Sequence, residues 1–321
     1  MKRFFLWGWT LCLAAVSCSR PAKDLYTVGV LEILDSGTVR EVRRGLLQAL
    51  SDGGLRDGTN VRIEIRNGQG NIPLVHRFAR GFVDDGVDLI VPTSTQSLQA
   101  TLIATSSLPV VFSSVANPYL AGAVRSAAEH RPNVTGVCST APIREALAIV
   151  REVLPRARRL GTLWTPSEMN SEYYLELARE ASSALGFDIV PVPVENPSDV
   201  LLAARVLINK KVDAIYQISD NTTNAAFEAL AKAADENGVP LFSGSLLAVR
   251  VWAAAAVGWD FYAMGYKSGQ LVLRVKNGES PAAIPFESMS DVRLALNRQA
   301  ASRQGVVFPE AILKRATEIL E

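Results

Sequence analysis

Alternation of strand and helix patterns most constrains how this 321-residue chain can fold. Residues 26–31 form a short β-branched run, and residues 39–50 follow with apolar side chains spaced three and four apart, as on one helix face. Runs typical of buried strands recur at 88–91 and 109–112, with a helical stretch between them. This order predicts an α/β fold in which helices cover both faces of a mainly parallel sheet.

The second half of the chain repeats this order of elements. Residues 212–216 echo residues 87–91, and residues 239–243 echo residues 108–113. Self-similarity on this scale indicates a duplicated supersecondary design. We therefore expect two Rossmann-like lobes of similar construction.

The first residues have the pattern of a targeting segment. Lys2 and Arg3 precede an apolar run over residues 4–16, which is shorter than the roughly 20 residues that span a bilayer. Small residues before Cys18 resemble the bacterial lipoprotein signal. We expect residues 1–17 to be a signal peptide, Cys18 to be lipidated and residues 18–24 to form a linker. An ordinary signal peptide cleaved nearby is the alternative.

Charge and composition exclude several function classes. Lys and Arg total 33 and Asp and Glu total 32, so the chain lacks the basic excess typical of nucleic-acid binding. Two His and three Cys leave little for a metal centre or a disulfide framework. Lipidation of Cys18 and loss of Cys12 would leave Cys138 without a partner. We expect no metal and no nucleic acid.

Polar residues gather in the loops that follow the expected strands, where open parallel sheets bind ligands. These loops are rich in Ser, Thr and Asn and contain no Lys, Arg, His or Cys. Thr95, Ser113 and Ser171 stand beside helix starts, where a carboxylate can bind, and Asp220 or Asp35 could take an ammonium group. The pattern favours a zwitterion. A sugar remains open, and helix capping is the structural alternative for each residue.

Motifs of the common enzyme classes are absent from the sequence. It contains no G-x-S-x-G elbow, no H-E-x-x-H zinc motif and no phosphate-binding G-x-x-x-x-G-K loop. The expected cleft loops also lack a general base with an orienting partner. A binding protein without catalytic activity or cofactor is therefore expected.

Short motifs in a defined order carry a family resemblance. They lie at residues 87–91, 108–118, 133–137, 212–216, 219–222, 258–262 and 264–265. Together they resemble ABC transporter substrate-binding proteins of the type I periplasmic-binding fold, and most closely the subgroup for tryptophan and tyrosine uptake. The resemblance implies two Rossmann-like lobes joined by a three-strand hinge, with crossovers near residues 118, 245 and 286. Lobe 1 would comprise 25–118 plus 246–286, and lobe 2 would comprise 119–245 plus 287–321.

The resemblance and the cleft loops together define a set of expected ligand contacts. They are Asp35, Ser36, Thr93, Thr95, Ser113, Ser114, Asn117, Asn170, Ser171, Asp220, Asn221, Ser243, Ser245 and Asp260. The chain departs from the family at Asn117, where Asp is usual, and in the loop 243–246, which lacks the usual acidic residue. A carboxylate is thus missing from the expected site.

The resemblance also implies a function. We expect a monomeric, lipid-anchored protein outside the cytoplasm, in the periplasm or on the outer cell surface, that closes on a small polar ligand. The expected ligand is an amino acid, with aromatic ones favoured, and the expected partners are an ABC permease and its ATPase. A ligand-sensing subunit for a membrane receptor and a sugar- or nucleoside-binding protein are the alternatives.

Overall fold

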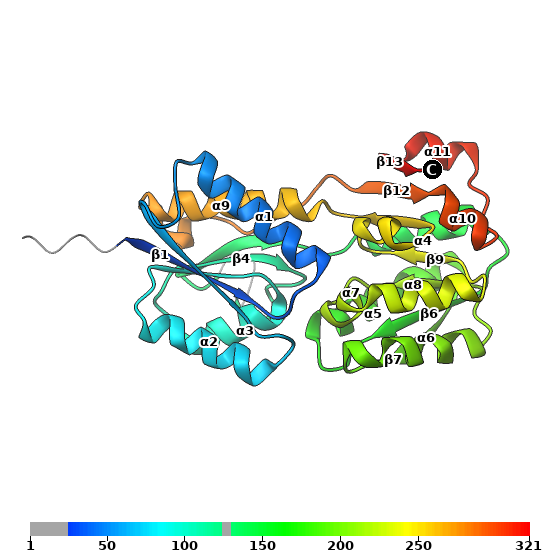
Figure 1. Cartoon of the computed structure of the whole chain (residues 1–321), viewed down its shortest axis with the longest axis horizontal. Helices are drawn as coiled ribbons and strands as arrows, with labels where there is room; N and C mark the ends of the chain where they lie inside the picture. The colour runs from blue at the N-terminus through cyan, green and yellow to red at the C-terminus, as the bar shows by residue number, and fades with distance from the viewer. Residues whose placement is uncertain (1–24, 124–129) are drawn as a thin grey trace, which may run out of the picture.

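The computed structural model describes residues 25–123 and 130–321, which form two lobes side by side (Figure 1). The expected signal peptide, Cys18 and linker lie outside the described residues. Each lobe has its own sheet with helices on both faces, as the strand–helix alternation predicted. Within the described part, no helix has both the length and the apolar character needed to cross a membrane.

The first lobe contains a parallel sheet in the order β11-β5-β4-β3-β1-β2. Its strands are β1 (Tyr26–Glu32), β2 (Val61–Asn67), β3 (Leu89–Pro92), β4 (Val110–Val115), β5 (Val134–Cys138) and β11 (Glu287–Ser288). Its helices are α1 (Gly37–Asp52), α2 (Ile72–Asp84), α3 (Thr95–Ala104), α9 (Phe261–Lys276) and the short η3 (Pro281–Ala283). Apolar side chains of α1 and α9 pack on one face of the sheet, and those of α2 and α3 pack on the other.

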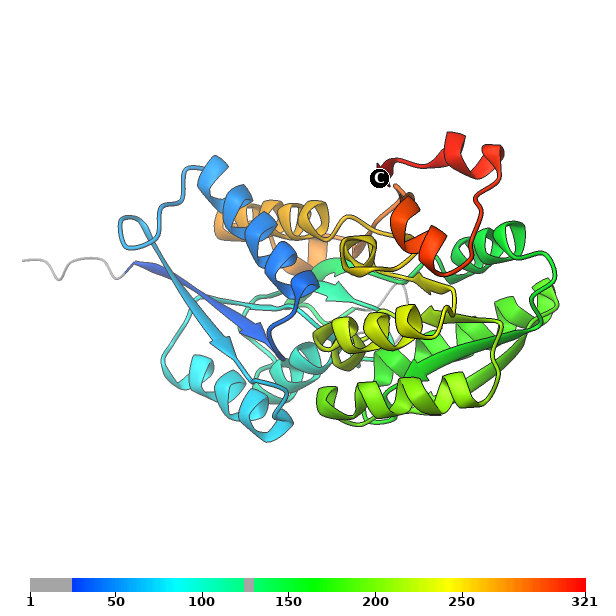
Figure 2. The same cartoon turned by 45° about the vertical axis from the view of Figure 1, so that its right-hand side comes forward.

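Helices α1 and α9 lie against each other although much of the chain separates them (Figures 1 and 2). A methyl group at Gly265 would overlap the backbone of Val42, and one at Gly45 would overlap the backbone of Tyr262. Glycine at both positions lets the two backbones approach closely. This contact ties α9 to the segment that follows β1.

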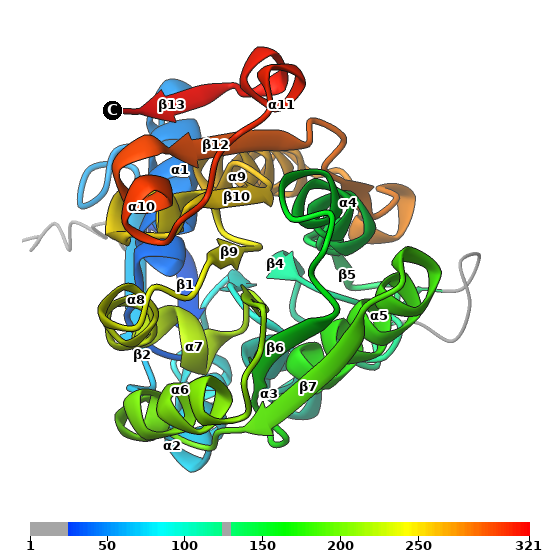
Figure 3. The same cartoon turned by 90° about the vertical axis from the view of Figure 1, so that its right-hand side faces the viewer.

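The second lobe contains a mixed sheet in the order β13-β12-β10-β9-β8-β6-β7, with β12 antiparallel to β10 (Figure 3). Its strands are β6 (Arg159–Trp164), β7 (Asp188–Pro193), β8 (Ala214–Gln217), β9 (Leu241–Ser243), β10 (Ala255–Gly258), β12 (Arg293–Asn297) and β13 (Glu318–Leu320). Its helices are α4 (Ile143–Val153), α5 (Met169–Leu185), η1 (Pro197–Asp199), α6 (Val200–Asn209), α7 (Asn221–Ala225), α8 (Phe227–Glu236), η2 (Leu246–Val251), α10 (Arg298–Arg303) and α11 (Glu310–Arg315).

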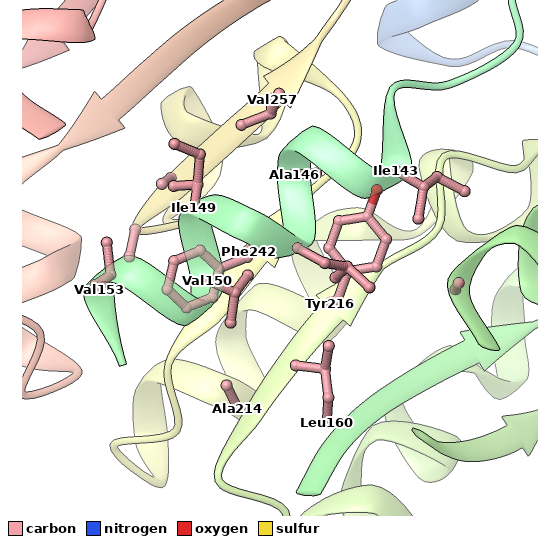
Figure 4. Close-up of a cluster of buried hydrophobic side chains, with 14 of the residues drawn as sticks. Ile143, Ala146, Ile149, Val150, Val153, Leu160, Ala214, Tyr216, Phe242 and Val257 are labelled. Atoms are coloured by element: carbon pink, nitrogen blue, oxygen red, sulfur yellow. The ribbon is translucent and has the colours of Figure 1, made fainter. Parts of the chain in front are cut away.

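A large apolar cluster holds the second lobe together. Ile149 and Val150 of α4 point toward the sheet, where Tyr216 of β8 and Phe242 of β9 meet them (Figure 4). Removing apolar surface from water on this scale is the main favourable term in folding. The cluster therefore fixes α4 against the strands whose ends face the first lobe.

The chain passes between the lobes three times. The expected crossovers near residues 118 and 245 are wrong, whereas the third lies close to the expected residue 286. The chain crosses after β5, after β10 and after β11, so β5 belongs to the first sheet and β10 to the second. The expected crossover near residue 118 is instead a turn, in which Asn117 Oδ1 accepts hydrogen bonds from the Tyr119 and Leu120 N–H groups. That turn leads the chain back to the first sheet for one more strand.

Candidate ligand-binding cleft

A cavity lies between the lobes, beside the crossovers that follow β5 and β10. The eighteen residues that line it are all uncharged. They come from the carboxyl ends of strands and from the helix starts that follow them, where the sequence predicted a site. The cavity can thus hold a small polar molecule by hydrogen bonds.

The first-lobe wall presents the start of α3. The Ser94 Oγ accepts from the Ser97 N–H at 3.2 Å, and the Ser97 Oγ accepts from the Ser94 N–H at 2.9 Å. This capping box fixes the helix start, so that Thr95 lies on the cavity wall. N–H groups in a first helical turn lack intrahelical partners and form the positive end of the helix dipole. This wall therefore suits a carboxylate.

A bulge in β4 separates two adjacent serines. The register between β4 and β5 shifts between Phe112 and Val115, and Ser114 has a positive φ of 56°. Ser113 turns toward α9, where its Oγ accepts from the Ser268 Oγ at 2.8 Å, whereas Ser114 lines the cavity. Bulges commonly redirect a side chain in this way near binding sites.

The second-lobe wall presents Asn170 and Asn221, with the carboxylate of Glu168 behind them. Glu168 is buried at 5% exposure. It accepts hydrogen bonds from Asn170 Nδ2 at 3.0 Å, from Asn221 N at 3.0 Å and Nδ2 at 2.8 Å, and from Thr222 N at 2.9 Å and Oγ1 at 2.6 Å. The wall is therefore neutral at its surface and acidic one layer behind it.

Asp220 is buried in the second lobe and does not line the cavity, contrary to the expected ammonium contact. Its oxygens accept from the hydroxyls of Ser171 at 2.5 Å, Thr165 at 3.2 Å and Thr223 at 2.5 Å, and from the Thr223 N–H at 2.7 Å. Burial, and then the nearby charge of Glu168, raise the pKa of Asp220 to about 7. Asp220 organises the start of α7.

A direct contact joins the lobes across the cleft. The Asn221 Nδ2 of the second lobe donates to the Gln96 Oε1 of the first at 2.9 Å. At the hinge, the Trp259 Nε1 donates to the Thr140 carbonyl at 2.9 Å, and Tyr174 donates its hydroxyl to the Ser139 carbonyl at 2.6 Å. The two lobes therefore meet in a closed arrangement around the cavity.

The structure brings together only part of the expected contact set. Five of these residues line the cavity: Thr93, Thr95, Ser114, Asn170 and Asn221. Others stabilise the fold, namely Ser36, Ser113, Asn117, Ser171, Asp220, Ser243 and Asp260. Asp35 pairs with Arg40 and, with Ser36 and Ser245, borders a neighbouring hollow.

Several lining residues were missed by the sequence analysis. Thr38 at the start of α1 and Asn224 of α7 share a segment with expected contacts but were not singled out. Tyr174, Trp259 and Phe261 supply aromatic surface to the cavity. Their place beside strand ends was a usable signal, although aromatic residues near strands pack in cores more often than they contact ligands.

Two α/β lobes that are joined by three crossovers and closed around a neutral cavity define a binding protein of the type I periplasmic-binding fold. The family model "ABC transporter substrate binding protein" matches residues 27–320, so the chain belongs to this family. Members of this family act outside the cytoplasm and are not enzymes. Within residues 25–123 and 130–321, no group of three or more His, Cys, Asp or Glu side chains is placed to hold a metal ion.

Individual relatives agree with the family. The chain is 29% identical to a tyrosine-binding protein of Clostridioides difficile over 86% of this chain and 80% of that protein. A Streptococcus pneumoniae ABC domain in complex with L-Trp matches with a TM-score of 0.88 and 25% identity, covering 92% of this chain and all of that one. The ligand-free, open structure of a Clostridium difficile substrate binding protein matches with a TM-score of 0.68 and 26% identity, over 92% and 99%.

Proposed function

We propose that this protein is the solute-binding component of an ABC importer and that its ligand is an aromatic amino acid. The observation that carries the proposal is the opposite polarity of the two cavity walls. The start of α3 suits a carboxylate, and the carboxylate-backed amides of Asn170 and Asn221 suit an ammonium group. A zwitterion placed across the cavity would meet both.

The aromatic preference follows from the remaining lining. Tyr174, Trp259 and Phe261 lie on the cavity wall, and Tyr174 and Trp259 have their polar atoms occupied by backbone carbonyls of the hinge. Trp259 and Phe261 are only partly buried, so their rings can make apolar or stacking contact with a ligand side chain. The tyrosine-binding relative and the tryptophan complex support this ligand class.

Closure of the lobes on the ligand is the proposed mechanism. The tryptophan complex matches this chain with a higher TM-score than the open, ligand-free structure does, although the two identities are nearly equal. This difference supports a closed lobe arrangement in the present structure. A ligand that contacts both walls stabilises the closed form by its differential affinity for it, and the permease would receive that form.

A thermal-shift screen of the mature chain tests the ligand class. L-tyrosine and L-tryptophan should raise the melting temperature, because a ligand that binds only the native state at 100 times its Kd adds about 2.7 kcal/mol of stability. Glucose, a nucleoside and L-glutamate serve as controls. A shift with the sugar or the nucleoside, and none with the aromatic amino acids, would reject the proposed ligand.

The lipid anchor is proposed from the N-terminal sequence alone. Cys18→Ala should move the protein from the membrane fraction to the released fraction of intact cells, since no acyl chain could then be attached. A variant that stays membrane-bound in the same amount would contradict the anchor.

A further inference from the structure

Glu168 is the buried carboxylate that lies behind the second-lobe wall of the cavity. It stands at the N-cap position of α5 and does not line the cavity. All five groups that donate to it are neutral, and four of them are amide N–H groups that can only donate. Such a set of donors matches the acceptor oxygens of a carboxylate.

The carboxylate dictates how Asn170 is oriented. Because the Asn170 Nδ2 donates to the Glu168 Oε2, the Asn170 Oδ1 must point the other way. That oxygen is buried and has no hydrogen-bond partner among the described residues, although Asn170 is only 6% exposed and lines the cavity. A buried acceptor without a partner is costly, so its place on the cavity wall points to a ligand donor.

We propose that Glu168 is a positioning residue that makes the cavity select ligands carrying an ammonium group. It turns the Asn170 Oδ1 toward the ligand, and its negative charge behind the neutral wall favours a cation there. A donor–acceptor chain from the ammonium through the Asn170 amide to the carboxylate strengthens each of its hydrogen bonds. This inference rests on the proposed function, because it assigns the amine of that ligand to the second-lobe wall.

The same carboxylate also supports lobe closure. It accepts from the backbone N–H and the side-chain amide of Asn221, and that amide reaches Gln96 across the cleft. Recognition of the amine and the interlobe contact therefore share one anchor. A ligand ammonium bound to Asn170 would therefore be linked, through the Glu168 carboxylate, to the Asn221 amide that reaches Gln96.

Calorimetric titration with L-tyrosine and with 3-(4-hydroxyphenyl)propanoate, which differ in the amine alone, tests this role. The wild type should prefer L-tyrosine by about 10- to 100-fold, the usual range for hydrogen bonds to a charged group. Glu168→Gln should lower that preference about tenfold, because a neutral amide removes the charge and cannot accept from all the same donors. The matched control is Glu172→Gln, an exposed position on α5, which should keep the wild-type preference.

Asn170→Ala provides a second route to the same readout, which matters if Glu168→Gln folds poorly. It should lower the amine preference to a similar extent, and the double variant should lose little more, because both residues act in one chain. Equal weakening of both ligands in Glu168→Gln, or an unchanged preference in Asn170→Ala, would overturn the inference while leaving the ligand class intact. A wild type that binds neither compound, and does not bind L-tryptophan, would reject the proposed function and the inference together.

Discussion

Both walls of the cavity present neutral polar groups at their surfaces, but the groups behind these surfaces have opposite electrostatic polarity. The first lobe offers hydroxyls and the start of α3, with the positive end of a helix dipole beneath. The second offers amides with the carboxyl groups of Glu168 and Asp220 beneath. A cavity lined entirely by neutral groups can therefore be polarised for a zwitterion, because its charges sit one layer deeper.

Reversing the polarity of the first-lobe wall should have the largest effect on ligand affinity. Thr95→Asp places a negative charge where the ligand carboxylate is expected, and like charges in contact cost several kcal/mol, so affinity for L-tyrosine should fall at least about 100-fold. An acidic residue in the first turn of a helix interacts favourably with the helix dipole, which offsets part of the cost of burying the new charge. Isothermal titration measures the loss, and Thr95→Ser, which keeps the hydroxyl, is the control. If Thr95→Asp binds L-tyrosine with wild-type affinity, the ligand carboxylate does not bind at this wall.

Titration of Asp220 should make the stability of the second lobe depend on pH. Its pKa is raised from 3.8 in the reference state to about 7 in the fold, so the native state holds a proton that the unfolded chain has released between these values. The free energy of unfolding should therefore fall as the pH rises from about 4 to about 7, by up to about 1.4 kcal/mol per pH unit.

Asp220→Asn should flatten that slope in denaturant unfolding measured across the same pH window. Asp199→Asn, at an exposed position of the same lobe, should leave it unchanged. An unchanged slope in Asp220→Asn would show that Asp220 is not the group that binds the proton.

Removing the hydrogen bond between the two walls should have the smallest effect on ligand affinity. Gln96→Ala removes the hydrogen bond to Asn221 and should weaken L-tyrosine and L-tryptophan equally, by about fivefold, the worth of one neutral hydrogen bond. The loss should be uniform because Gln96 does not line the cavity. Binding titrations measure it, with exposed Ile103→Ala on the same helix as the control. Unequal losses for the two ligands would mean that Gln96 contacts the ligand.

The strand–helix alternation was sufficient to predict two α/β lobes and the edge of each sheet where the cavity lies. It could not predict which of two adjacent serines faces the cavity, because the bulge at Ser113 and Ser114 breaks the alternation of a regular strand without a local sequence signal. The first crossover was misplaced because Asn117 and Pro118 form a turn that resembles a boundary. Glu168 and Asp220 both follow strand ends, and only tertiary contacts separate their roles.

The contact of α1 with α9 limits how proteins of this design can be recombined. One wall of the cavity is built from α1 and from the start of α9, yet five of the seven strands of the second sheet lie between them in the chain. A hybrid made with one breakpoint would pair α1 of one parent with α9 of the other, and a residue larger than glycine at position 45 or 265 would force the helices apart. Exchange of a whole cavity wall between relatives thus requires two breakpoints and matched small residues on both helices.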